Sequence, residues 1–63
     1  MITFEIIEQY TNEGYRYKIE TKHLNYNHIR YERLAPSVLV DKMYEITEKM
    51  NNIYNEDCDF VVG

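Results

Sequence analysis

The chain has little of what usually holds a small protein together. Its 63 residues include one cysteine, one proline, two glycines and no tryptophan. A single cysteine, Cys58, excludes a disulfide within the chain, and a lone thiol is typical of a reducing compartment. We therefore expect a cytoplasmic protein. Chains this short bury only about 60% of their unfolded surface, so association with a second copy is the expected source of further burial.

Residues 1–63 also lack the pattern of a secretion signal or a membrane helix. Residues 1–8 carry acids where a secretion signal would carry bases. No apolar run approaches the roughly 18 residues that a membrane helix needs. With Gly14 and Gly63 as the only glycines, a phosphate-binding glycine-rich loop is excluded. We expect a soluble protein with no membrane partner.

Groups with the arrangement of a catalytic or metal site are lacking as well. The potential metal ligands do not have zinc-site spacing: His23, His28, Asp57, Cys58 and Asp59. Ser37 and Cys58 do not lie in a nucleophile motif. A domain of this size also has little room for a substrate pocket of a few hundred cubic ångströms. We expect no enzyme, no catalytic residues, no metal and no cofactor.

One segment is long and periodic enough to organise the fold. Between residues 36 and 54, apolar side chains recur every three or four residues, which predicts an α-helix with one apolar stripe. The stripe consists of Leu39, Met43, Ile46, Met50 and Ile53. Pro36 suits the first turn, with Ser37 as an alternative N-cap. Asn51, Asn52 and Asn55 are the expected stop.

Residues 2–34 alternate apolar and polar side chains as strands do. Strands are expected over residues 2–10, 15–23 and 27–34, with turns at 12–14 and 25–27. The face expected under the helix carries Ile2, Phe4, Ile6, Tyr17, Ile19, Ile29 and Tyr31, while Ile7, Leu24 and Leu34 fall on the other side.

Two pairings of the first hairpin keep its apolar faces together. A two-residue turn at Glu13 and Gly14 sets Glu5 opposite Lys22. A longer turn starting at Thr11 sets Glu5 opposite Glu20. We predict the first pairing because it matches opposite charges.

The predicted fold class is α+β, with a three-stranded antiparallel β-meander packed on one C-terminal α-helix in a single domain, residues 1–63. The tail from residue 56 to residue 63 ends in β-prone side chains. We expect it either to add a short fourth strand, paired with a strand edge of the same or of another subunit, or to fray.

Charge is unevenly distributed along the chain. The net charge of −4 divides into −3 for residues 1–14, +3 for residues 15–34 and −4 for residues 35–63. A basic face beside an aromatic is typical of single-strand nucleic-acid binders, and its candidate residues are Arg16, Lys18, Lys22, Tyr26 and Arg30. Acids interleave with these bases and the whole chain is acidic, so a solvated sheet face is the simpler interpretation.

Seven tyrosines favour a contact surface, because tyrosine offers a large area at low rotamer cost. The candidate partner-binding residues are Tyr10, Tyr15, Arg16, Lys18 and Tyr26. Apolar residues beyond the stripe favour self-association, with Val40, Tyr44, Tyr54, Phe60 and Val62 as the candidate oligomer interface. A two-fold homodimer is the default geometry.

These observations favour a small, non-enzymatic protein-binding module. The abundance of isoleucine, asparagine, tyrosine and lysine suggests an AT-rich coding sequence. The hypothesis is a phage or mobile-element accessory protein that acts in the host cytoplasm as a homodimer. It would inhibit a host defence or nucleic-acid-processing factor. Nucleic-acid or nucleotide binding through the basic, tyrosine-bearing sheet face is the alternative.

Overall fold

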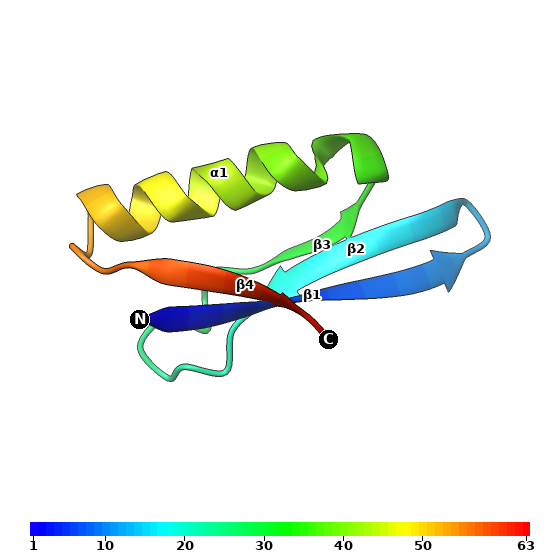
Figure 1. Ribbon diagram of the computed structural model, residues 1–63. Coiled ribbons are helices and arrows are strands. Elements are labelled where there is room, and N and C mark those ends of the chain that lie inside the picture. Colours follow the sequence, from blue (N-terminus) through cyan, green and yellow to red (C-terminus); the bar gives the residue numbers. More distant parts are fainter.

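A computed structural model, which describes all of residues 1–63, shows one helix lying across one face of a four-stranded sheet (Figure 1). The elements follow one another as β1 (Ile2–Thr11), β2 (Gly14–Glu20), β3 (Tyr31–Leu34), α1 (Pro36–Asn52) and β4 (Cys58–Val62). The α+β class is as predicted.

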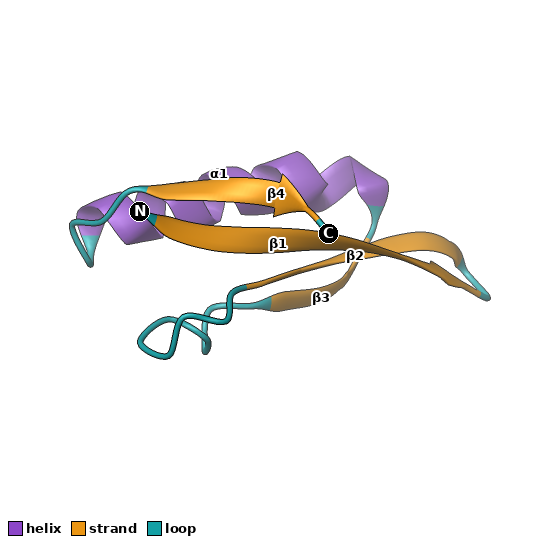
Figure 2. Ribbon diagram, turned by 60° about the horizontal axis from the view of Figure 1, so that its bottom comes forward, coloured by secondary structure: helices purple, strands orange, loops and turns teal.

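The sheet is mixed, with the strand order β3-β2-β1-β4. The first three strands form the expected antiparallel meander. The tail forms a fourth strand, which pairs in parallel with β1 and sets Phe4 opposite Phe60. The prediction of a purely antiparallel sheet is therefore wrong. Since β3 and β4 lie at opposite edges, α1 carries the chain back across the sheet between them (Figure 2).

Helix α1 begins with Pro36 in its first turn, where the missing N–H costs nothing. Ser37 is not the N-cap. Ala35 precedes the helix in an extended conformation, and no side chain caps it. The helix ends at Asn52, and Asn55 then takes the left-handed conformation that asparagine tolerates, with a φ of 53°.

The apolar stripe packs on the sheet, with one exception. Ile46 and Met50 are fully buried, and Leu39 and Met43 pack against the same core. Ile53 was predicted to join them, but its side chain is 67% exposed. Ile53 is the C-cap residue: its N–H still donates to the Lys49 carbonyl, but its side chain does not pack against the core.

The sheet face under the helix carries the predicted residues. On the strands Ile2, Phe4, Ile6 and Ile19 are buried, and Ile29 is buried with them from the loop before β3. Tyr17 and Tyr31 are half-buried against the same core. Away from this core, the β1–β2 hairpin extends past the start of α1, so its tip has no helix above it (Figures 1 and 2).

The β1–β2 register is the one that we did not predict. Glu5 lies opposite Glu20, and Tyr10 lies opposite Tyr15. The two-residue turn is Asn12-Glu13, and Gly14 follows it with a φ of +98°. Lys22 still reaches Glu5, with 3.9 Å between Nζ and Oε1. The ion pair on which the prediction was based therefore forms although the predicted register does not.

The third strand is shorter than predicted and contains a bulge. The backbone N–H groups of Tyr26 and Ile29 donate to the carbonyls of His23 and Tyr26, which form turns where residues 27–30 were expected to be strand. Between the pairs Ile19↔Tyr31 and Tyr17↔Leu34, β3 has one extra residue.

That extra residue decides where Leu34 points. Arg33 takes a left-handed φ of 56° inside the bulge, and the following side chain turns to the other face. Leu34 was predicted on the polar side, but it is buried in the core. Without the bulge, strict alternation would have placed the Leu34 side chain on the polar face, as predicted.

Candidate protein-binding surfaces

The tip of the β1–β2 hairpin presents two tyrosines side by side. Tyr10 and Tyr15 are cross-strand neighbours whose rings meet edge to face, with centroids 5.1 Å apart. Their side chains are 78% and 53% exposed. Edge-to-face aromatic pairs are stabilised by about 0.5–1.5 kcal/mol beyond their buried area, so the pair holds its arrangement while still facing solvent.

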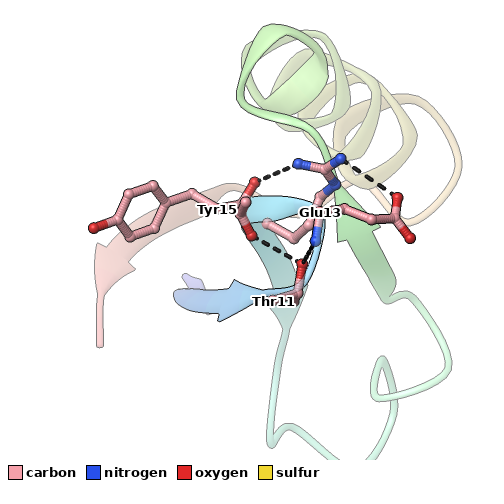
Figure 3. A network of polar contacts seen from close by, with 5 residues as sticks. Thr11, Glu13 and Tyr15 are labelled. Atoms are coloured by element: carbon pink, nitrogen blue, oxygen red, sulfur yellow. Dashed lines mark hydrogen bonds and ion pairs between the residues drawn. The ribbon is translucent and has the colours of Figure 1, made fainter.

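A network of polar contacts stiffens the turn that joins the strands of the two tyrosines, and Figure 3 shows it with Tyr15. The Thr11 hydroxyl donates to the Gly14 carbonyl at 2.9 Å and accepts from the Glu13 N–H at 3.1 Å. The Arg16 guanidinium donates to the Tyr15 carbonyl at 2.8 Å and lies 3.6 Å from the Glu13 carboxylate. Both strands that carry the tyrosines are thereby tied to the turn.

The hairpin also has a polar contact on its helix-side face. The Tyr17 hydroxyl donates to the Glu8 carboxylate at 2.8 Å. This hydrogen bond raises the pKa of Tyr17, because the carboxylate disfavours the phenolate. Glu8 and Tyr17 face each other across the strands, so the contact reports the observed register directly.

The predicted basic face is largely neutralised by neighbouring acids. Lys18 lies 3.8 Å from Glu20, and Lys22 lies 3.9 Å from Glu5. Arg30 makes no ion pair and borders an open polar hollow of about 530 Å³ next to His28. Arg16 and Lys18 lie on one face of β2, as the alternation predicts, while Lys22 and Arg30 lie in the loop between β2 and β3. All of these bases except Arg30 lie beside a carboxylate.

Tyr26 does not lie with those bases. Its ring packs against the core and between His23 and Tyr54, with centroid distances of 5.0 Å to each. The His28 ring joins this aromatic cluster through a 3.2 Å hydrogen bond with the Tyr54 hydroxyl. The sequence analysis missed the cluster, because His23, Tyr26 and His28 come from the loop after β2 and Tyr54 from the segment after α1.

A third surface lies where α1 faces β4. Three of the predicted interface residues, Val40, Tyr44 and Phe60, line one shallow hollow of about 210 Å³ together with Met43 and Thr47. Val62 is exposed at the end of β4. Tyr54 is elsewhere, in the aromatic cluster, so the structure brings together three of the five candidates in one hollow.

The two flanks of α1 differ in charge. Toward β4, the residues at helical spacing are all uncharged: Ser37, Val40, Tyr44, Thr47 and Asn51. On the opposite flank, Lys42 lies 2.9 Å from Glu45, which also accepts a 2.9 Å hydrogen bond from Tyr31.

These contacts shift two pKa values. Lys42, and to a smaller extent Tyr31, lower the pKa of Glu45. Burial, followed by the hydrogen bond to Glu45, raises the pKa of Tyr31.

Among the residues of the fold, no group of three or more His, Cys, Asp or Glu side chains is arranged to hold a metal ion. Helix α1 is neither long nor apolar enough to cross a membrane. Compared with protein-family models, curated proteins and solved structures, the chain has no match.

Proposed function

We propose that the chain is a non-enzymatic protein-binding module whose partner surface is centred on Tyr10 and Tyr15. The observation that supports the proposal is the exposed, edge-to-face tyrosine pair on a hairpin that projects beyond its own helix. Tyrosine is enriched among the residues that dominate binding energy at protein interfaces. Two such side chains, already held in place, lose little rotamer freedom when a partner covers them.

Two of the candidate partner-binding residues are basic and lie on the opposite face of the hairpin from the tyrosine pair. Arg16 lies on the other face of the same strand, half-buried and held by Glu13, and Lys18 follows at the next position on that face. Charged groups at the rim of an interface contribute mainly to the association rate and to partner choice. Since Glu13 and Glu20 already lie beside Arg16 and Lys18, the proposed partner is a protein with an apolar pocket for the tyrosines.

The kind of partner follows from the coding bias and from elimination. We extend the proposal to an inhibitor from a phage or mobile element, which acts as a homodimer on a host defence or nucleic-acid-processing factor. A binder that occludes another protein needs a rigid contact surface and no catalytic groups of its own.

Affinity capture with matched variants tests the proposed function. The tagged protein, the Tyr10→Ser, Tyr15→Ser double variant and a Leu24→Ser control are compared on lysate of the host. Leu24 is 85% exposed and lies in the loop after β2, away from the hairpin tip. We expect one protein to be retained by the first and third baits and reduced at least tenfold on the second. Equal retention on all three baits would overturn the hairpin assignment.

Nucleic-acid binding is the second candidate, and its supporting observation is Arg30, which has no ion pair beside its polar hollow. It predicts binding to a generic oligonucleotide that weakens steeply as salt rises, because phosphate contacts release counterions. Binding that Arg30→Gln abolishes and Arg33→Gln leaves intact would favour this candidate over the protein-binding module.

A further inference from the structure

The outer edge of β4 presents a row of backbone groups that no strand of the chain covers. The Ile2 N–H donates to the Asp57 carbonyl at 2.9 Å, and the Gly63 N–H donates to the Ile6 carbonyl at 3.0 Å. Backbone groups of successive strand residues point to alternate edges. The odd-numbered residues from 57 to 63 therefore face β1, and Cys58, Phe60 and Val62 direct their N–H and C=O groups outward.

The two edges of the sheet differ in how they are protected. The β3 edge is interrupted by the bulge at Arg33 and flanked by Arg30 and Glu32, which are devices that discourage a further strand. β4 pairs with β1 in an unbroken register, and it has no bulge, proline or lysine. Its edge is the one that can accept another strand.

On the helix side the surface beside this edge is uncharged and apolar, while Asp59 of β4 lies on the opposite face of the sheet. The flank of α1 over β4 carries Val40 and Tyr44, and together with Phe60 they line the shallow hollow. The opposite flank of the same helix is charged and engaged with β3. An open strand edge and an uncharged helix flank thus adjoin on one side of the molecule, where a partner would cover both.

Charge and the number of backbone hydrogen bonds together select the register in which a second β4 fits. Antiparallel pairing centred on Phe60 sets Phe60 against its own copy, Cys58 against Val62, and Asp59 against Val61, and it uses every outward-facing group. Three donors from each copy give about six hydrogen bonds between the copies. A shift centred on Asp59 would place two carboxylates directly opposite each other, which is destabilising. A shift centred on Val61 sets no carboxylates opposite each other, but it leaves the outward-facing groups of Cys58 unpaired, so the register centred on Phe60 makes the most hydrogen bonds.

We propose that two copies of this chain pair through β4, antiparallel and centred on Phe60, to form one continuous sheet. The two-fold axis places both helices on the same face, so the hollows that Val40 and Tyr44 line adjoin and are closed over the paired strands. This inference specifies the homodimer of the proposed function, but it does not depend on the hairpin surface. The Tyr10→Ser, Tyr15→Ser variant should dimerise normally.

Two single-cysteine proteins test the register. In a Cys58→Ser background, Asp59→Cys and Val61→Cys are made separately. Directly opposite residues of a non-hydrogen-bonded antiparallel pair have Cα atoms about 4.5 Å apart, within the range of a disulfide. Each variant alone should stay largely uncrosslinked under oxidation, because identical positions are two residues out of register. Their mixture should give at least tenfold more covalent dimer.

Equal crosslinking in the mixture and in the separate proteins would overturn the proposal, as would faster self-linking of either variant. Hydrogen exchange of the unmodified protein is an independent measurement. The amide protons of Cys58, Phe60 and Val62 should exchange at least tenfold more slowly at high protein concentration than at low concentration. Fast exchange of these amides at every concentration would contradict the pairing of two copies, and a strand of another protein would then be the occupant of the edge.

Discussion

Arg33 is the residue whose backbone conformation most shapes the sheet. Its left-handed φ of 56° creates the bulge that turns Leu34 into the core. A β-branched side chain is strained in this conformation, and glycine is not. We expect Arg33→Val to be less stable than Arg33→Gly by about 1–2 kcal/mol, measured by urea unfolding. Equal unfolding free energies would show that the bulge is absent in solution.

Glu45 gives the structure a pH-dependent contact. Its pKa is lowered by Lys42 and Tyr31, so the folded state binds a proton less readily than the unfolded state. This contribution to stability is present above the ordinary glutamate pKa of about 4.3, and it is lost as pH falls through the lower, folded-state value.

The matching prediction concerns Glu45→Gln. At neutral pH the variant should unfold more easily than the unmodified protein, and the difference should shrink as acid protonates Glu45 in the unmodified protein. Thermal unfolding at a series of pH values measures it. A difference that stays constant from neutral to acid pH would show that the contacts of Glu45 do not depend on its charge.

At the scale of elements, helix α1 is held by a narrower stripe than its spacing predicts. Ile46 is fully buried and Ile53 is mostly exposed, although both belong to the same sequence pattern. Ile46→Ala should cost about 2–5 kcal/mol, because it leaves a cavity between the helix and the sheet. Ile53→Ala should change stability by about 0.5 kcal/mol or less. Similar losses from both substitutions in urea unfolding would contradict the packing of α1.

The register of the β1–β2 hairpin shows where sequence reasoning lacks resolution. Both pairings keep the apolar faces together, so charge was used to choose between them. Exposed ion pairs contribute only about 0–1 kcal/mol, and long side chains such as Lys22 reach an acid from either register. The contacts that accompany the observed register are local: the Thr11 hydrogen bonds in the turn, the Tyr10–Tyr15 pair and the hydrogen bond of Tyr17 to Glu8.

At the scale of the whole molecule, periodicity predicted the helix, the strands of the hairpin and the buried face, because these depend on neighbours a few residues apart. The bulge and the parallel pairing of β4 could not be predicted in the same way. Arginine carries no signal for a left-handed backbone, and the position of the tail depends on α1 bringing it back beside β1. The hollow between Tyr44 and Phe60 exists only after that return.

The central claim is that α1 lies across the sheet and leaves its uncharged flank and the β4 edge open for a second copy. Sedimentation equilibrium of the unmodified protein, Tyr44→Asp and the control Leu24→Asp tests it. Both positions are exposed in the single chain, so both variants should fold. We predict twice the single-chain mass for the unmodified protein and for Leu24→Asp, and a shift toward the single-chain mass for Tyr44→Asp. A single-chain mass for all three proteins, or an unchanged dimer for Tyr44→Asp, would contradict the account.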